Sequence, residues 1–260
     1  MDWTSDEPLD ASALRTTIQA WIEQFLPVYC AGHNVPHIWR TPLVGFADAH
    51  HRELVEFRQT FPDCILPEEL LPQATIVLAW FLPYKKELAA TNASADLASP
   101  AWAAAYRDTN ALFPVIAYEL ATHLAAHGVR TAADAARFDR ERLTSRWSHR
   151  HFPYLAGLGT YGINHMLITR AGSCGCYYTL VTDLRVPPDS VCKEESCLYK
   201  RSGSCKACVR RCPTGALQVD AYDRALCAKA GEALRKESGS TGKGICGKCL
   251  VGIPCAFVAP

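Results

Sequence analysis

Residues 205–213 read CKACVRRCP, a single Cys227 follows, and residues 246–255 read CGKCLVGIPC. Together they hold seven of the nine cysteines found in the last 69 residues, out of 13 in the whole chain. A [4Fe–4S] cluster needs four thiolates, and in two-cluster ferredoxins the cysteine before a proline binds the neighbouring cluster. The spacing therefore predicts two [4Fe–4S] clusters.

Other uses of so many cysteines explain the pattern less well. Structural zinc is the main alternative, because the C-x2-C pairs at 205–208 and 246–249 can form a four-thiolate tetrahedral site. Zinc leaves Cys212, Cys227 and Cys255 without a role. A disulfide framework is disfavoured because the first 20 residues lack the basic segment, apolar run and cleavage site of a secretory signal.

Length and composition are compatible with a main core and a small appended module. The chain has 260 residues and a mass of 28.6 kDa, and its cysteine content changes near Val191. A chain of this length can bury one large core beside a smaller module. We therefore predict an α/β domain over residues 1–188 and a double-cluster module over residues 189–260.

The overall charge gives little indication of a nucleic-acid or membrane partner. The net charge is +1 and the isoelectric point is about 7.5, so no global field attracts polyanions. Basic side chains do gather around the first cysteine run: Lys200, Arg201, Lys206, Arg210 and Arg211. No apolar run approaches the roughly 20 residues of a membrane span. We expect a cytoplasmic protein without membrane contact, in a compartment that keeps thiols reduced.

Hydrophobic periodicity predicts alternating helices and strands in the first half of the chain. An amphipathic helix is predicted over 14–25, with Asp10 or Ser12 as its cap and Pro27 as its end. Further along, the pattern predicts these segments: a strand at 41–46, a helix at 48–59, a strand buried on both faces at 74–82, a loop at 88–99 and a long helix at 100–127.

A glycine-rich string follows the next predicted helix, at 146–155. Residues 156–162 read AGLGTYG, and three glycines so close together mark backbone that turns or is approached closely. These glycines follow a helix and not a strand, so they do not predict a dinucleotide site. Strands at 163–169 and 177–184 are predicted to pair with each other.

The chain resembles the epoxyqueuosine reductases over residues 100–260. The resemblance rests on AGLGTYGINHMLIT at 156–169, on VTDL at 181–184 and on the double cysteine run. That family is identified as cobalamin-dependent iron–sulfur enzymes of tRNA modification. It implies an α+β fold here: a nitroreductase-like sheet-and-helix domain that holds the corrinoid, followed by a ferredoxin-like module with two [4Fe–4S] clusters.

The resemblance also assigns cluster ligands. Four cysteines match one cluster, named cluster 2: Cys212, Cys227, Cys246 and Cys249. Three match the other, named cluster 1: Cys205, Cys208 and Cys255. The fourth ligand of cluster 1 falls in the family at the position of Ser202. Cys197 is the preferred replacement because residues 198–204 can loop back, and Cys192, Ser202 itself or an exogenous ligand are the alternatives.

Several family residues of the substrate pocket differ in this chain. Leu143 occupies the position of the family's proton-donating aspartate, and 108–110 read DTN where the family has Asp-Tyr-His. Reduction of an epoxide requires an acid for the departing oxygen, so we predict a reaction other than epoxyqueuosine reduction. His149 and His165 are candidate acids because histidine titrates near neutrality.

Residues of the glycine-rich string are the candidates for cofactor contact. Close backbone approach to a corrinoid rim is predicted at Gly157, Gly159, Gly162 and Asn164. The bend at residues 174–176, which contains Cys174 and Cys176, has two interpretations. It approaches a cluster or cofactor, or it forms a plain turn with a reserve thiol pair.

The sequence thus favours an iron–sulfur oxidoreductase. We expect low-potential electrons to pass through two [4Fe–4S] clusters to a cofactor, cobalamin by resemblance, or to a substrate in the N-terminal domain. An electron donor such as a ferredoxin or flavodoxin would be the partner, and a small molecule, a corrinoid or tRNA the substrate. The alternatives are an electron-transfer or corrinoid-activating protein without substrate chemistry, and a zinc-stabilised nucleic-acid-binding protein.

Overall fold

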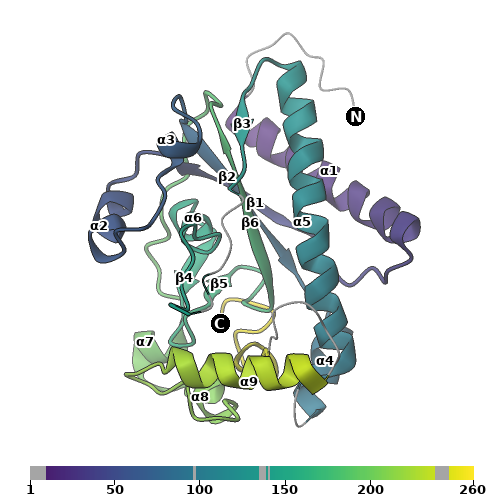
Figure 1. Ribbon diagram of the computed structural model, residues 1–260, viewed down its shortest axis with the longest axis vertical. Coiled ribbons are helices and arrows are strands. Elements are labelled where there is room, and N and C mark those ends of the chain that lie inside the picture. Colours follow the sequence, from purple (N-terminus) through teal and green to yellow (C-terminus); the bar gives the residue numbers. More distant parts are fainter. Residues whose placement is uncertain (1–9, 96–97, 135–138, 140, 238–245) are drawn as a thin grey trace.

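The computed structural model describes residues 10–95, 98–134, 139, 141–237 and 246–260 and has a mixed α/β fold (Figure 1). Its main sheet has the strand order β1-β2-β6-β3, and all its neighbouring strands are antiparallel. These strands span Leu43–Asp48 (β1), Ile76–Pro83 (β2), Gly175–Thr182 (β6) and Thr131–Ala132 (β3). The predicted strand at 74–82 is confirmed as β2, the strand that joins the two halves of the sheet.

All eight residues of β2 are buried because both faces of the strand carry apolar layers. Trp80 lies opposite Val44 of β1 and opposite Tyr178 of β6. Successive side chains point to opposite faces. Trp80 therefore packs into the larger core, while its neighbour Ala79 packs into a smaller core on the other face.

Helices α1, α4 and α5 contribute to the larger core, and Figure 1 shows α1 and α5 beside the sheet. They span Ala11–His33 (α1), Lys86–Ser94 (α4) and Pro100–Ala126 (α5). Asp10 caps α1, as predicted, because its Oδ2 accepts from the N–H of Ala13 at 3.0 Å. The predicted end of α1 at Pro27 is wrong. Burial of Tyr29 and Cys30 continues the apolar stripe beyond Pro27 and compensates for the hydrogen bond that proline cannot make.

The smaller core lies under the remaining helices of the sheet region. Its helices span Arg52–Thr60 (α2), Pro67–Leu70 (α3) and His151–Leu155 (α6). The helix predicted at 146–155 is therefore shorter than expected, with only its last turn formed. The loop predicted at 88–99 is also wrong, because α4 buries Leu88, Ala89 and Asn92 against the core.

A two-stranded sheet lies beside the main one. It pairs β4 (Gly159–Tyr161) with β5 (Leu167–Thr169), whereas β6 pairs with β2 and β3. The predicted pairing of 163–169 with 177–184 is wrong. The long apolar β2 offers β6 eight paired positions, while the glycine-rich string turns back onto β5.

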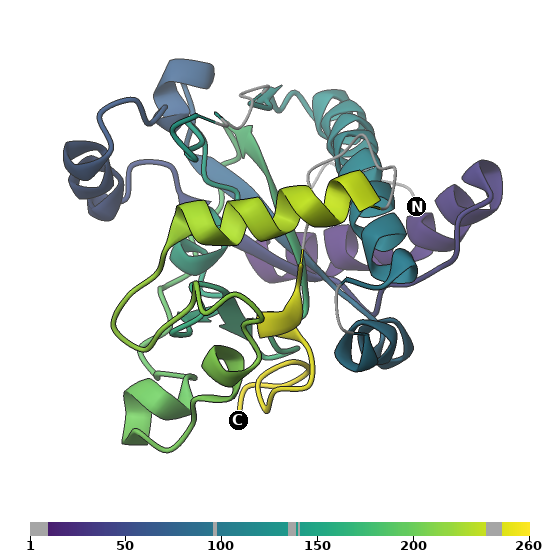
Figure 2. The same cartoon turned by 60° about the horizontal axis from the view of Figure 1, so that its bottom comes forward.

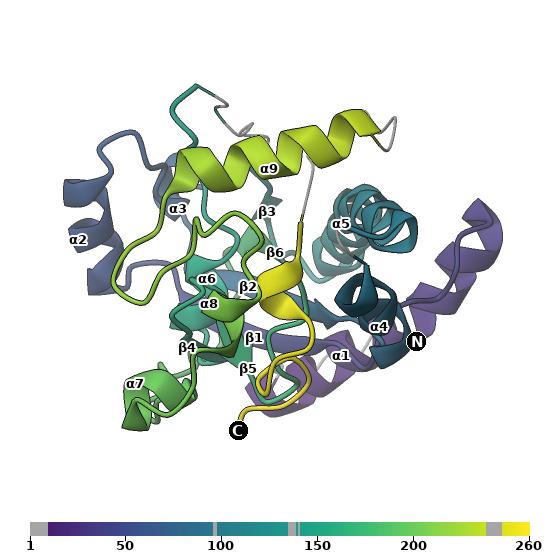
Figure 3. The ribbon, with the colours of Figure 1, turned by 90° about the horizontal axis from the view of Figure 1, so that it is seen from below.

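The cysteine-rich C-terminal part lies at one end of the sheet (Figures 2 and 3). It contains α7 (Leu198–Ser202), α8 (Ala207–Arg210), α9 (Arg224–Glu237) and a short 3-10 turn at Lys248–Leu250. Its apolar residues join the same core as α1 and α5: Cys208, Leu217, Leu250, Val251, Ile253 and Ala256. A domain boundary at residue 188 stays a prediction. Among the described residues, none of the helices combines the length and hydropathy that a membrane span requires.

Candidate metal centre

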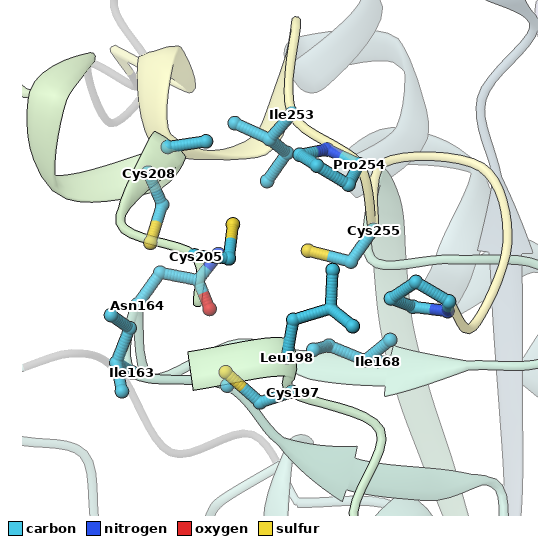
Figure 4. A pocket seen from close by; sticks show the side chains of 13 residues that line it. Ile163, Asn164, Ile168, Cys197, Leu198, Cys205, Cys208, Ile253, Pro254 and Cys255 are labelled. Carbon is cyan, nitrogen blue, oxygen red and sulfur yellow. The ribbon is translucent and has the colours of Figure 1, made fainter. Parts of the chain in front are cut away.

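Four cysteines line one cavity at the end of the sheet (Figure 4). They are Cys197, Cys205, Cys208 and Cys255. The first precedes α7, the next two flank the start of α8, and the last belongs to the C-terminal segment. The rest of the wall is mostly apolar and includes Leu198, Ile168 and Ile253. The fold therefore brings together thiols from both ends of the cysteine-rich region.

Cys197 reaches this cavity because Glu195 shapes the preceding turn. Glu195 Oε1 accepts from the backbone N–H of Cys197 at 2.8 Å and from the Thr160 hydroxyl at 3.1 Å. Thr160 Oγ1 in turn accepts from the N–H of Ser196 at 2.9 Å. These bonds anchor the entry to α7 against β4. Sequence reasoning missed Glu195, and the only signal was its position two residues before a cysteine.

The two other candidates for the fourth ligand of cluster 1 are turned elsewhere. The Cys192 thiol donates to the carbonyl of Gly157 at 2.9 Å. The exposed Ser202 hydroxyl donates to the carbonyl of Leu198 at 2.9 Å and lies 2.8 Å from the hydroxyl of Ser204. Neither residue belongs to the cavity lining. Of these candidates Cys197 is the one that lines the cavity, and its role as the fourth ligand stays a prediction.

The cysteines assigned to cluster 2 also lie near one another. Burial raises the pKa of Cys249 to about 12, and the thiols of Cys246, Cys227, Cys208 and Cys212 add to this increase, so one cysteine of the other set also lies nearby. Two buried asparagines hold the backbone of the final loop. Asn92 Nδ2 donates to the carbonyl of Cys246 at 3.0 Å, and Asn164 Nδ2 donates to the carbonyl of Cys249 at 2.9 Å.

The electrostatics of these thiols depend on burial and on mutual repulsion. Burial raises the pKa of Cys208 to about 11, with further contributions from Cys255, Cys197 and Cys205. Cys212 behaves differently. Burial by itself would raise the pKa of Cys212, but hydrogen bonds to its sulfur lower it. One of these bonds comes from the backbone N–H of Leu217, which donates to Cys212 Sγ at 3.3 Å. Metal binding to such thiols would release protons.

Thiols bind iron–sulfur clusters and zinc alike, and the two groups differ in how the sulfurs must be arranged. Within the described ranges, no three His, Cys, Asp or Glu side chains are close enough to hold one ion. The sulfurs of Cys205, Cys208 and Cys255 instead stand around an open space (Figure 4). Thiolates that bind different irons of one cube need such a separation, whereas a tetrahedral zinc site draws its sulfurs to one point.

The glycines predicted to face a cofactor are crowded by this chain itself. A Cβ at Gly157 would lie 2.3 Å from the carbonyl oxygen of Ser190, and one at Gly159 would lie 2.1 Å from that of Ile168. A Cβ at Gly162 would lie 2.7 Å from Asn164 Oδ1. Close approach of other parts of this chain therefore already requires glycine at these positions. A corrinoid contact at Gly157, Gly159, Gly162 and Asn164 stays a prediction.

The two candidate histidines contact different elements. The His149 ring stacks on Tyr178 of β6, with centroids 4.2 Å apart, and its Nδ1 lies 2.9 Å from the hydroxyl of Thr179. His165 has a φ of 57° in the turn before β5, and its ring centroid is 5.0 Å from that of Tyr222. Burial lowers the pKa of His165, with nearby Arg150 acting in the same direction. This lowered pKa favours the neutral form of the His165 ring.

The bend at Cys174 and Cys176 connects the sheet to the cysteine cavity. The N–H of Ser173 donates to the carbonyl of Cys255 at 2.9 Å, and the N–H of Cys174 donates to that of Ala256 at 3.0 Å. Cys174 is fully buried, and Cys176 Sγ lies 3.2 Å from the hydroxyl of Tyr84. The backbone of the bend thus contacts the segment of Cys255, while the described residues that line the cavity include neither thiol. A cluster or cofactor contact of Cys174 and Cys176 stays a prediction.

No family model matches the chain, and a search of curated protein sequences found no significant match. Solved structures do match. An epoxyqueuosine reductase from Bacillus subtilis, with its catalytic loop swung out of the active site, gives a TM-score of 0.52 at 19% identity over 91% of this chain and 66% of that one. The enzyme from Streptococcus thermophilus gives 0.52 at 17% identity over 92% and 68%.

A third match is an epoxyqueuosine reductase solved with an epoxyqueuosine-modified tRNA-Tyr stem loop. Its TM-score is 0.50 at 20% identity, over 91% of this chain and 66% of that one. This chain is thus a mixed α/β protein. More particularly, it is similar in fold to epoxyqueuosine reductases across nearly its whole length, which confirms the resemblance and extends it upstream of residue 100. The matched region covers 66% of the Bacillus subtilis chain, which is slightly under two thirds of its length.

Proposed function

We propose that this protein is an iron–sulfur reductase that passes electrons through two [4Fe–4S] clusters to a cofactor or substrate held by the α/β region. The observation that carries the proposal is the shared cavity of Cys197, Cys205, Cys208 and Cys255. These residues are the ligand set predicted for cluster 1. Four thiols around one apolar-walled space make a site that can hold a cube.

The second set of cysteines supports a second cluster. The proposal of a second cluster is supported by Cys246 and Cys249, because burial and the thiols of Cys227 and Cys212 raise the pKa of both. The zinc alternative joins the pairs 205–208 and 246–249 in one site. In this fold the first pair belongs to a cavity with Cys197 and Cys255, so the alternative is disfavoured.

The protein's own groups would prepare these sites for low-potential chemistry. When bound, such clusters supply single electrons, and their potentials depend on hydrogen bonds to sulfur and on solvent exposure. Apolar side chains such as Ile253 and Leu198 line the cluster 1 cavity and would limit water. The N–H of Leu217 donates to Cys212 Sγ, and the Ser173 hydroxyl donates to the Cys255 carbonyl at 3.1 Å. These contacts orient the thiolates.

Cobalamin and the substrate enter the proposal through similarity of fold. Cobalamin would supply the reducing centre in the α/β region, as the resemblance implies. Leu143, with a φ of 54°, occupies the position predicted for the proton donor. An apolar side chain cannot protonate a departing oxygen. We therefore propose reduction of a substrate other than epoxyqueuosine, with a small molecule, a corrinoid or a tRNA as the candidate classes.

The electron donor would be a small acidic protein such as a ferredoxin or flavodoxin. Four exposed basic residues lie on α7 and α8 or directly before α8, close in sequence to Cys205 and Cys208: Lys200, Arg201, Lys206 and Arg210. Glu195 offsets part of this charge, because its carboxylate lies 3.6 Å from Lys200 Nζ. A basic surface speeds encounter with an acidic partner. Such a partner and reduced thiols are both typical of the cytoplasm, so we propose a cytoplasmic location.

Anaerobic purification tests the proposal directly. The expected product is a brown protein with about eight irons per chain and electron paramagnetic resonance signals of two reduced [4Fe–4S] clusters. Added cobalamin should then change its absorption spectrum. A colourless protein with bound zinc would contradict the iron–sulfur function. Clusters without any response to cobalamin would favour the alternative of an electron-transfer protein that acts on a separate enzyme.

A further inference from the structure

A buried tryptophan carries an indole N–H that has no acceptor in the described part of the chain. Trp102 lies in the first turn of α5, and only 2% of its surface is exposed. Its Nε1 atom is buried and makes no hydrogen bond to any described residue. Buried indole N–H groups usually find a partner, because leaving a buried donor unpaired is costly. This donor therefore requires an explanation.

The ring edge that carries this N–H faces the segment between two proposed ligands of cluster 2. This segment, residues 246–249, is named the cysteine loop. A Cβ added at Gly247 would collide with three atoms of the Trp102 ring, Nε1 among them. Gly247 also has a φ of 66°, which favours glycine. The glycine thus lets the indole approach the backbone between Cys246 and Cys249.

A chain of hydrogen bonds fixes Trp102 relative to the cysteine loop. The backbone N–H of Trp102 donates to the Ser99 hydroxyl at 3.1 Å, and the backbone N–H of Ser99 donates to Asn92 Oδ1 at 3.0 Å. The side-chain amide of Asn92 donates to the carbonyl of Cys246 at 3.0 Å. The Trp102 ring also packs edge to face with Tyr84, with centroids 5.4 Å apart. These contacts hold the indole in one orientation beside the loop.

A cluster bound by the cysteine loop supplies acceptors for such a donor. The thiolates and sulfides of a [4Fe–4S] cluster carry negative charge, and hydrogen bonds to charged acceptors are stronger than those to neutral ones. Hydrogen bonds to these sulfurs are among the quantities that set the reduction potential of a cluster. A reduced cluster carries one more negative charge than an oxidised one, so a donor stabilises the reduced state more.

We propose that the indole N–H of Trp102 donates a hydrogen bond to a sulfur of cluster 2 and raises the reduction potential of that cluster. This inference rests on the proposed function, because it requires a cluster at Cys212, Cys227, Cys246 and Cys249. Trp102 would make cluster 2 a better electron acceptor than its cysteine ligands alone would.

Redox titration of the iron-loaded protein, followed by electron paramagnetic resonance, tests the effect on the potential. Trp102→Phe keeps an aromatic ring at this position and removes the N–H. We expect it to lower the ratio of reduced to oxidised cluster 2 about tenfold at a given potential, a shift of about 59 mV for one electron. The potential of cluster 1 should stay unchanged and serves as an internal reference.

Trp80 provides a matched control. Its Nε1 atom is also buried and makes no hydrogen bond to any described residue. Its ring packs against Phe113 and Tyr178 in the sheet region, with centroids 6.4 Å and 5.3 Å away. Trp80→Phe makes the same chemical change at this other place and should leave both potentials as in the wild type.

Isotope labelling detects the hydrogen bond itself. Iron-loaded protein with ¹⁵N in the indole rings of its tryptophans should show a ¹⁵N coupling to reduced cluster 2 in pulsed electron paramagnetic resonance. The coupling should disappear in labelled Trp102→Phe and persist in labelled Trp80→Phe. A tryptophan ring that only fills space beside the cysteine loop would not give this pattern.

The proposal is overturned if Trp102→Phe leaves the potential of cluster 2 unchanged or shifts both clusters equally, or if the labelled wild type shows no coupling to cluster 2. Trp102→Leu is a second variant without the N–H, and whichever variant retains about eight irons is titrated. If neither retains cluster 2, the coupling in the labelled wild type and in Trp80→Phe decides. Wild-type protein without iron would refute the proposed function itself, before any variant is compared.

Discussion

The backbone N–H of Ser173 donates to the carbonyl oxygen of Cys255 at 2.9 Å. Ser173 lies two residues before the first residue of β6, and Cys255 is the last cysteine of the chain. This bond ties a central strand of the main sheet to the rim of the cysteine cavity. The sheet thereby positions one wall of the proposed cluster 1 site, and the site does not depend on its own short loops alone.

Replacement of Ser173 by alanine should weaken this connection. The Ser173 side chain is fully buried, and its hydroxyl donates to the carbonyl of Cys255 at 3.1 Å. Loss of such a buried hydrogen bond costs about 1–3 kcal/mol. Urea unfolding of the iron-loaded protein measures this change in the free energy of unfolding. Ser204→Ala, at an exposed position, should change it by less than about 0.5 kcal/mol; equal effects would contradict the prediction.

Cys197→Ser should remove one cluster, and Cys192→Ser should not. Cys197 lines the cavity with three other cysteines, whereas the Cys192 thiol is bonded to the Gly157 carbonyl. A cube needs four ligands, so the first variant should bind about four irons per chain and the second about eight. Iron analysis and electron paramagnetic resonance after anaerobic reconstitution provide the measurement. The reverse result would show that Cys192 is the fourth ligand.

Stability should decrease below neutral pH because of His151. Burial lowers the pKa of His151 to about 4 from its ordinary value of 6.5, with His51 adding a smaller effect in the same direction. Between these values the unfolded chain binds a proton that the folded chain does not. Acidification from about pH 6.5 to about pH 4 should thus cost roughly 3 kcal/mol of stability.

His151→Phe should remove this component of the pH dependence. The His151 ring already packs 4.7 Å from that of Phe57, so an aromatic ring suits the position. Chemical denaturation at a series of pH values measures the slope. An unchanged slope in His151→Phe would exclude His151 as its source.

Charge reversal on α8 should slow electron delivery. Lys206 and Arg210 are exposed beside the cluster 1 cavity, and Lys206→Glu with Arg210→Glu would repel an acidic ferredoxin or flavodoxin. The rate of reduction by such a donor should fall about tenfold or more at low salt and converge with the wild type at high salt. Stopped-flow absorbance measures the rate.

The control for this experiment is Arg142→Glu. Arg142 is exposed and pairs with Asp63 at 2.8 Å, away from α8. Reversal of this charge should leave the rate of reduction unchanged. If the α8 double variant instead weakens binding of a tRNA stem loop and leaves the electron transfer rate as it is, the basic surface serves nucleic acid.

Local patterns in the sequence determined much of this protein. The apolar run at 74–82 predicts β2. The long helix predicted at 100–127 is flanked by Ser99 and Gly128. Asp10 is one of the two caps predicted for α1. The cysteine spacing indicated two ligand sets. Each of these features depends on neighbours within a few turns of chain, where periodicity, capping and loop length are readable.

Tertiary structure decided what depends on distant partners. The α1 helix continues past Pro27, and α4 forms at 86–94, because the sheet and the cysteine loop bury their side chains. Cys197 and Cys255 line the same cavity because α7 folds against the C-terminal segment. Lys248 donates to the carbonyl of Asn92 because α4 packs against the cysteine loop. Contacts between positions so far apart follow from packing of the whole core, because spacing along the chain specifies only local geometry.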